Sequence, residues 1–382
     1  MKATRKDKRQ DFILKTIIPF VKIWMFFDMK VTYIYHESFD RKRKEPYVLL
    51  ANHTFMFDVI HTPINLKKTP FIVAGHNLFT KQPLKFVLEN IAHTIPKFKG
   101  TSDIRTARGL IGAVKKGYPI CIFPEGNTTF NGETTYIEES TMKLIKKLKI
   151  DVVGVKVQGG YLSKPRWAME KRKNKRAIMN YKVIIPKEDL KELSIEEISE
   201  IVNRELYNND YAYQKEVMIP HPGKNKASGL ENILYICSEC ENFGTLHTSG
   251  DTITCSHCKS VGTVNDYGFI EGLKFDNTVE WDNWQRKFND QLITEVIESP
   301  AKIYDVNDLD LSRVYLGQVN IKYIDRKFII RGAFDLVLPF DVIKSTFVTL
   351  RRNFNVTYQD KHYLIKIEQF VSSFLRVVQN KY

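Results

Sequence analysis

From residue 47 to about residue 220, short β-rich runs alternate with helical stretches, and this alternation constrains the fold more than any other feature. The strand candidates are 47–51, 70–75, 119–123, 151–159 and 178–185, and the helical stretches between and after them are 103–117, 141–149 and 194–208. Strands that alternate with helices predict an α/β layer with a mostly parallel sheet. In such sheets the functional residues gather in the loops at the strand ends.

The rest of the chain divides by composition into further parts. Residues 1–45 precede the α/β region, which we place at 46–220, and the polar stretch "HPGKNKASGL" at 221–230 resembles a linker. We expect a small cysteine-bearing domain at 231–264. Residues 265–382 hold a helical stretch at 280–297, short alternating β runs from about 312, and a closing helix, which together predict a β-rich domain.

The first 45 residues are basic and then strongly apolar. Lys15, Pro19 and Lys22 interrupt the apolar run, so it is neither a signal peptide nor a spanning helix of about 20 apolar residues. The net charge of +14 favours anionic partners. We therefore expect an amphipathic helix in the interface of a membrane that contains anionic lipid, although a helix packed on the protein's own core is the alternative.

Two short motifs contain the candidate chemistry. "ANHTFMFD" at 51–58 follows a strand-like run and contains His53 and Asp58, five positions apart. "CIFPEGNTTF" at 121–130 is an apolar strand that runs into Glu125 and Gly126, where a glycine permits close approach of a ligand to the backbone. Alone, the His and Asp pairing is a weak signal, and the second motif strengthens it.

Four blocks in this order resemble the glycerolipid acyltransferase family, typified by 1-acyl-glycerol-3-phosphate acyltransferase. They are "NHTFMFD", "GHNLFTKQPLKFVLENIAHTIPKFKG", "FPEGNTT" and "VVGVKVQGGY", and the resemblance covers roughly residues 10 to 215. It implies transfer of a fatty acyl group from a thioester of coenzyme A or acyl carrier protein to a lysophospholipid hydroxyl. Conversion of lysophosphatidic acid to phosphatidic acid is the first expectation.

The residues of the first motif suit that chemistry. An alcohol is a poor nucleophile at neutral pH, and His53 can take its proton as a general base. Asp58 can fix the tautomer of His53, as in a serine hydrolase triad whose serine is replaced by the hydroxyl of the substrate. The two side chains would share a face if a helix began near residue 53. The apolar residues between them, 55–57, either line a dry site or belong to the core.

The resemblance places Glu125, Gly126 and Asn127 in the pocket for the glycerol and phosphate of the acceptor; a carboxylate at a helix N-terminus is the alternative for Glu125. The family pattern "FPEGTRS" differs here, because Thr128 stands where the family has arginine. The basic position of the preceding block falls on Lys97, which keeps the charge but not the forked geometry of arginine. Further basic residues could join it in holding a phosphate: Lys99, Arg105 and Arg108. These departures leave open a different lysolipid or alcohol as acceptor.

Four of the five cysteines form two C-x2-C pairs, "CSEC" at 237–240 and "CSHC" at 255–258. This spacing predicts a structural zinc ribbon with Cys237, Cys240, Cys255 and Cys258 as ligands, because four thiolates leave no open coordination position. Such cysteine usage fits a reducing interior. Nucleic-acid binding is disfavoured, since residues 237–260 hold one lysine and no arginine. The fifth, Cys121, is expected to be buried in a strand.

The β-rich end of the chain weakly resembles a pleckstrin-homology-like domain. Taken together, the sequence predicts a cytoplasmic acyltransferase that binds peripherally to the inner face of a membrane and uses an acyl donor on coenzyme A or acyl carrier protein. The rival from another class is a non-catalytic scaffold that binds lipid in the old pocket. No Gly-rich Lys-Ser/Thr loop is present to hold ATP.

Overall fold

The computed structural model describes residues 2–80, 82–97, 104–135, 137, 139–307 and 312–379. The chain forms two compact units. Unit 1 consists of residues 1–129, 133–161 and 175–213, and unit 2 consists of 130–132, 162–174 and 214–382. None of the helices in the described part of the chain combines the length and the apolar character that crossing a bilayer requires.

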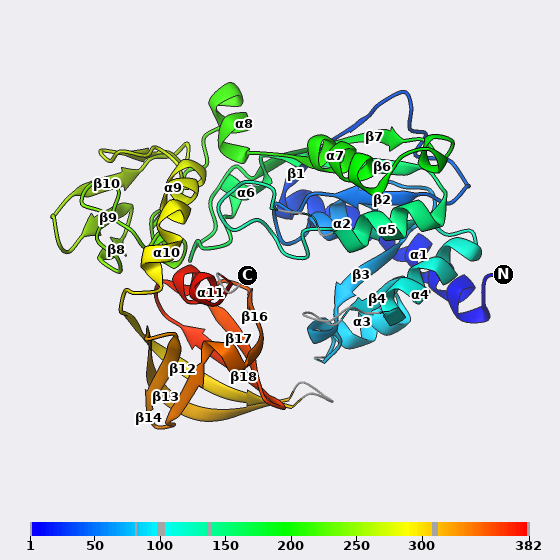
Figure 1. The fold of residues 1–382 in the computed structure, drawn as a ribbon. Helices are drawn as coiled ribbons and strands as arrows, with labels where there is room; N and C mark the ends of the chain where they lie inside the picture. Colours follow the sequence, from blue (N-terminus) through cyan, green and yellow to red (C-terminus); the bar gives the residue numbers. More distant parts are fainter. Residues whose placement is uncertain are drawn as a thin grey trace. The chain divides into compact units, whose positions relative to one another are not determined.

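Unit 1 is built on a seven-stranded sheet with the order β1-β7-β6-β2-β5-β3-β4 (Figure 1). Its strands are β1 (Lys30–Tyr35), β2 (Val48–Ala51), β3 (Phe71–Gly75), β4 (Thr94–Lys97), β5 (Ile120–Ile122), β6 (Val152–Gln158) and β7 (Arg176–Ile185). The five strands from β6 to β4 in this order are parallel, and β7 runs antiparallel to β6. The mostly parallel α/β sheet predicted from the sequence is confirmed.

The central strands are buried on both faces because helices and loops cover both sides. Val48 and Leu50 of β2 point into one cluster, and Leu49 and Ala51 point into the other, as the alternation of a strand requires. The first cluster is covered by α4 (Ile104–Lys115), α5 (Glu139–Leu148) and α7 (Ile195–Leu206). Cys121 lies fully buried in the second cluster, as expected.

The N-terminal segment forms one long helix and then a strand. Helix α1 (Arg5–Asp28) begins at a capping box of Thr4 and Asp7 and contains Pro19. Residues 30–35 form β1, which pairs in parallel with β7, so the end of the expected segment 1–45 belongs to the sheet. The remaining helices that lie in or begin in unit 1 are α2 (Asp58–His61), η1 (His76–Thr80), α3 (Leu84–Asn90), α6 (Gly160–Ser163), η2 (Asp189–Lys191) and α8 (Asp210–Val217).

The described residues of unit 2 form two antiparallel sheets and three short α-helices. The first sheet has the order β11-β10-β9-β8 and consists of β8 (Leu246–Ser249), β9 (Thr252–Cys255), β10 (Val261–Val264) and β11 (Ile270–Glu271). The helices are α9 (Thr278–Gln285), α10 (Asn289–Leu292) and α11 (Val371–Gln379), with short 3-10 turns η3 (Leu230–Asn232), η4 (Arg286–Phe288) and η5 (Phe340–Val342).

The second sheet of unit 2 is the predicted β-rich region. Its seven strands have the order β15-β14-β13-β12-β18-β17-β16, and α11 follows the last of them. They are β12 (Ile297–Val306), β13 (Arg313–Ile324), β14 (Lys327–Gly332), β15 (Leu336–Pro339), β16 (Ile343–Thr349), β17 (Asn353–Tyr358) and β18 (Lys361–Ile367). The helical stretch expected to reach residue 297 ends at Leu292, and residues 297–306 form an additional strand in the middle of this sheet.

Candidate active site

Several candidate residues lie at the carboxyl edge of the parallel sheet. Val48 and Leu50 of β2 pair with Ile120 and Ile122 of β5, so the loops that follow both strands leave the sheet at the same edge. His53 stands two residues after β2, and Glu125 three residues after β5. Parallel pairing therefore brings together two motifs that are about 70 residues apart in the sequence.

Asn52 fixes the chain immediately before His53. Its amide Nδ2 donates to the carbonyl of Val157 (2.8 Å), and its Oδ1 accepts from the N–H of Val157 (2.7 Å). The side chain is buried and imitates a pair of backbone ladder bonds between β2 and β6. These two hydrogen bonds hold the backbone segment that positions His53.

His53 and Asp58 are in direct contact. His53 Nδ1 lies 2.9 Å from Asp58 Oδ2 in a hydrogen bond and 2.8 Å from Oδ1. Asp58 is fully buried, and its Oδ2 also accepts from the N–H groups of Thr54 (2.8 Å) and Phe55 (3.2 Å). Two backbone donors thus hold the carboxylate against Nδ1, which leaves Nε2 of His53 available for other chemistry.

The local structure differs from the expected helix that starts near residue 53. Helix α2 starts at Asp58, and the preceding residues form a turn. The turn forms because the Asp58 carboxylate accepts the N–H groups of Thr54 and Phe55, which folds the chain back on itself. The pair is therefore joined by a side-chain-capped turn and not by helical spacing.

His61 is a second histidine in this region, at the end of α2. It is buried, and its Nδ1 lies 2.8 Å from the hydroxyl of Tyr33. Burial lowers the pKa of His61 to about 4, against the opposing influence of Asp28 and Asp58. His61 is therefore neutral at pH 7, and its buried position suits a packing role.

Glu125 lies in the loop that follows β5. Its Oε1 accepts from the backbone N–H of His53 (2.7 Å), and its Oε2 accepts from the N–H (2.8 Å) and hydroxyl (3.1 Å) of Thr135. Burial raises the pKa of Glu125 to about 7, although the hydrogen bonds from Thr135 and His53 oppose the shift. Glu125 is in a turn and does not start a helix, so the helix N-terminus alternative is wrong.

Gly126 leaves open space beside this carboxylate. Its backbone is left-handed (φ +70°), and a Cβ built there would meet no atom within 4 Å. The glycine is therefore required by its conformation and not by crowding. Asn127 follows it and is half-buried.

Lys97 ends β4 at the same edge of the sheet and is exposed. β3 lies between β4 and β5, so the spacing of strands places Lys97 roughly 10 Å from the β5 strand. Arg105 and Arg108 are exposed on α4. Lys99 lies outside the described residues.

The three apolar residues between His53 and Asp58 have different environments. Phe55 is a core residue, Met56 is half-exposed, and the ring of Phe57 lies 5.4 Å from that of Trp24 on α1. The core interpretation thus holds for Phe55. The contact of Phe57 joins the candidate site to the apolar part of α1.

The loop after β6 completes this edge and was missed by the sequence analysis. A Cβ at Gly160 would overlap Thr54 and Phe55, so only glycine permits this approach to the His53 turn. The buried carboxylate of Asp210 accepts from the N–H groups of Gly159 (2.8 Å) and Tyr161 (2.7 Å). The Gly-Gly pair after an apolar strand was a signal for close packing, whereas nothing local identified Asp210.

The four paired cysteines cluster in unit 2. Their sulfur atoms all lie within 4.8 Å of one another, with 3.7 Å between Cys237 and Cys258 and 3.8 Å between Cys240 and Cys255. A tetrahedral zinc site with metal–sulfur bonds of about 2.3 Å has edges of about 3.8 Å. The cluster is therefore compatible with a zinc ribbon.

Comparisons with known proteins agree with these features. A family model described as Acyltransferase matches residues 31–158, which include His53, Asp58 and Glu125. A search of curated proteins found no match.

Two solved structures were found among those similar to this chain. One is the crystal structure of the 1-acyl-sn-glycerophosphate (LPA) acyltransferase, PlsC, from Thermotoga maritima, with 18% identity and a TM-score of 0.42, covering 53% of this chain and 81% of that chain. The other is the solution structure of the N-terminal PH domain of the human ARAP2 protein, with 11% identity and a TM-score of 0.19, covering 22% of this chain and 76% of that chain. Likenesses this low carry no argument about fold or activity. The family match covers about a third of the chain, and residues 31–158 are therefore similar to the acyltransferase family.

Proposed function

We propose that this protein transfers a fatty acyl group from an acyl thioester to the hydroxyl of a lysophospholipid, with lysophosphatidic acid as the first candidate acceptor. The observation that carries the proposal is the buried Asp58 carboxylate on Nδ1 of His53, within a segment of the acyltransferase family. This pairing keeps a proton on Nδ1 and a lone pair on Nε2, as a general base requires.

The reaction then follows from the two side chains. Nε2 of His53 takes the proton of the acceptor hydroxyl while the hydroxyl oxygen bonds to the thioester carbonyl carbon. The Asp58 carboxylate stabilises the resulting imidazolium. When the tetrahedral intermediate collapses, the carbon–sulfur bond breaks, and the departing sulfur receives the proton from Nε2. The products are the ester and the free thiol, and no protein nucleophile is consumed.

The N–H groups next to the base are already occupied. Those of Thr54 and Phe55 donate to Asp58, and that of His53 donates to Glu125. They maintain the geometry of the base and are not available to stabilise an oxyanion.

We place the acceptor beside Glu125, at the open space next to Gly126. Asn127 is the neighbouring polar residue, and Lys97 supplies a positive charge at the same edge for the phosphate. The donor is a thioester on coenzyme A or on acyl carrier protein, whose shared chemical feature is the thioester carbonyl. The net charge of +14 is favourable for either anionic partner.

Helix α1 supports a peripheral position on a membrane surface. Its exposed apolar residues are Phe12, Phe20, Ile23, Trp24, Phe26 and Phe27, and its exposed basic residues are Arg5, Lys6, Lys8, Arg9, Lys15 and Lys22. Aromatic side chains in the acyl boundary and lysines at anionic headgroups are the arrangement of an interfacial helix. We place the enzyme on the inner face of the membrane, where a lysophospholipid acceptor can reach His53, and we assign a structural zinc ion to the four clustered cysteines.

The test is release of free thiol from palmitoyl-coenzyme A and from palmitoyl acyl carrier protein, with and without lysophosphatidic acid. The unaltered protein is compared with His53→Ala. We expect acceptor-dependent release that disappears in the variant. If neither thioester is consumed with a panel of lysolipids, the proposal fails and the non-catalytic lipid-binding scaffold takes its place.

A further inference from the structure

The loop that follows Glu125 is shared between the two units. Its flanks, Thr129 and Glu133, belong to unit 1, whereas its tip, residues 130–132, packs within unit 2. The flanks are fixed by their own contacts: Thr129 N–H donates to the carbonyl of His53 (2.7 Å), and Glu133 Oε1 accepts from the hydroxyl of Tyr207 (2.6 Å). The tip must therefore be explained by what holds it in unit 2.

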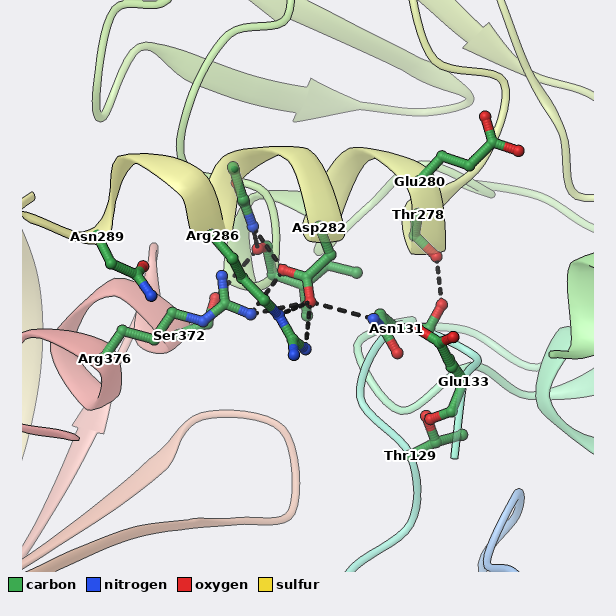
Figure 2. Close-up of polar contacts among 12 residues, drawn as sticks. Thr129, Asn131, Glu133, Thr278, Glu280, Asp282, Arg286, Asn289, Ser372 and Arg376 are labelled. Atoms are coloured by element: carbon green, nitrogen blue, oxygen red, sulfur yellow. Dashed lines mark hydrogen bonds and ion pairs between the residues drawn. The ribbon is translucent and has the colours of Figure 1, made fainter. Parts of the chain in front are cut away.

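Asn131 is the residue by which the tip is held. Its Nδ2 donates to Asp282 Oδ2 (3.1 Å), and its backbone carbonyl accepts from the hydroxyl of Thr278 (2.6 Å). Both partners lie on α9, and all three residues are buried. Figure 2 shows the Asn131 side chain pointing toward the helix and toward Asp282.

Asp282 is itself fixed by stronger partners. Arg376 Nη2 lies 2.7 and 2.8 Å from its two oxygens, and Arg286 Nη2 lies 2.8 Å from Oδ2 (Figure 2). Gln285 Nε2 donates to Oδ1 (2.7 Å). Burial alone would raise the pKa of Asp282, but Arg376 and Arg286 hold it below its usual value. Asn131 therefore binds a charged carboxylate whose position does not depend on Asn131.

Phe130 gives the tip a second attachment. Its ring lies 4.6 Å from the guanidinium carbon of Arg166, which donates to the carbonyls of Leu350 (2.7 Å) and Val348 (2.9 Å). Arg166 lies between α6 and β7, Val348 belongs to β16 in the large sheet of unit 2, and Leu350 directly follows that strand. The partner residues of both attachments lie outside residues 31–158, the segment that matches the acyltransferase family.

We propose that α9 clamps the tip of the loop that follows Glu125, with Asn131 as a positioning residue held by Thr278 and Asp282. This inference rests on the proposed function, because it assigns acceptor binding to Gly126 and Asn127, which lie between Glu125 and the clamped tip. A loop that is fixed in advance does not lose conformational entropy when the acceptor binds. The clamp therefore lowers the KM for the acceptor without touching the reacting atoms.

The test uses the full-length protein and two conservative changes, Asn131→Ala and Thr278→Val. Each removes one hydrogen bond to the tip and leaves the cluster of Asp282, Arg286 and Arg376 intact. Asn289→Ala is the matched control, because Asn289 follows α9 in unit 2 and its Oδ1 accepts a long hydrogen bond of 3.5 Å from the hydroxyl of Tyr235. We expect the KM for lysophosphatidic acid to rise about tenfold in Asn131→Ala, the loss of one hydrogen bond to a charged group, with the KM for palmitoyl-coenzyme A unchanged.

Amide hydrogen exchange of residues 126–130 is measured on the same proteins and needs no activity. We expect exchange to accelerate about tenfold in Asn131→Ala and to be unaltered in Asn289→Ala. Unchanged exchange in a folded Asn131→Ala protein would overturn the clamp. Equal increases in both KM values with a general loss of stability would also overturn it, in favour of a purely structural contact. Faster exchange in a protein that transfers no acyl group would support the clamp while refuting the proposed function.

Discussion

The sharpest test of the proposed base is Asp58→Asn. In the unaltered protein, Asp58 Oδ2 accepts from His53 Nδ1 (2.9 Å) and from the N–H groups of Thr54 (2.8 Å) and Phe55 (3.2 Å). Asparagine keeps the size of the side chain but removes its charge and replaces one oxygen by an N–H donor. The oxygen of the new amide can keep the two backbone donors, so that its nitrogen faces His53.

The catalytic effect follows from the proton position on His53. An amide that donates to Nδ1 moves the imidazole proton to Nε2, which then cannot accept the proton of an alcohol. The equivalent substitution in a serine hydrolase triad lowers kcat about 10⁴-fold. General-base catalysis as a whole contributes about 10²- to 10⁴-fold. We therefore expect kcat to fall about 10³-fold or more, with little change in the KM for either substrate.

The effect on stability should be modest. Hydrogen bonds to a charged group contribute about 1.5–3 kcal/mol and neutral ones about 0.5–1.5 kcal/mol. Weakening the bonds of two backbone N–H groups by about 1 kcal/mol each gives a loss of about 2 kcal/mol. Removing a buried charge offsets part of this loss, so the variant should remain folded.

The assay is acceptor-dependent thiol release, together with urea unfolding of the same samples. The control is Asp189→Asn, a change of the same kind at an exposed carboxylate in unit 1. A folded Asp58→Asn protein that keeps more than one tenth of the unaltered kcat would refute the assignment of His53 as a base oriented by Asp58.

Three further predictions concern a carboxylate, the surface and the metal. Because the pKa of Glu125 rises from 4.5 to about 7 on folding, the folded chain holds a proton that the unfolded chain has lost between these pH values. The resulting stability, about 3 kcal/mol in all, is present below pH 4.5 and is lost as pH rises through 7. Urea unfolding at pH 5 and pH 8 should show that Glu125→Gln loses this pH dependence. An identical pH dependence in both proteins would contradict the prediction. Phe20 and Phe27 are 71% and 78% exposed. Their replacement by serine should weaken the binding to anionic vesicles, measured by sedimentation, about tenfold per ring without changing the unfolding midpoint. Unchanged sedimentation would argue against α1 as the membrane contact. Elemental analysis should find one zinc ion per chain. A strong chelator should lower the thermal midpoint of unfolding, and added zinc should restore that midpoint. A metal-free protein with the same midpoint would exclude the zinc ribbon.

The sequence by itself determined the local features of this protein. The alternation of strands and helices identified the α/β sheet, and the motif order identified the acyltransferase segment, because periodicity and turn residues are properties of neighbouring residues. It also marked His53, Asp58 and Glu125 as polar residues at strand ends. The spacing of the four cysteines identified the cluster for the same reason.

Only the tertiary structure decided which distant groups hold these residues in place. Thr135 bonds to Glu125 from the segment before α5, Asn52 pairs with Val157 across the sheet, Asp210 orders the turn at Gly160, and Asn131 packs within unit 2. Each of these residues is an ordinary polar residue in its local sequence. Its role comes from a partner that the fold brings beside it, and sequence periodicity does not record such partners.

Strand β12 likewise depends on a partner that the local sequence does not record. Pro300 argues against a central strand, because it cannot donate to the ladder. Here β12 pairs with β13 along its length but with β18 only from Ala301 onward, so the missing N–H of Pro300 falls beyond the last pair with β18. Local sequence sets which backbone groups can donate, and the tertiary register decides whether a donor is needed.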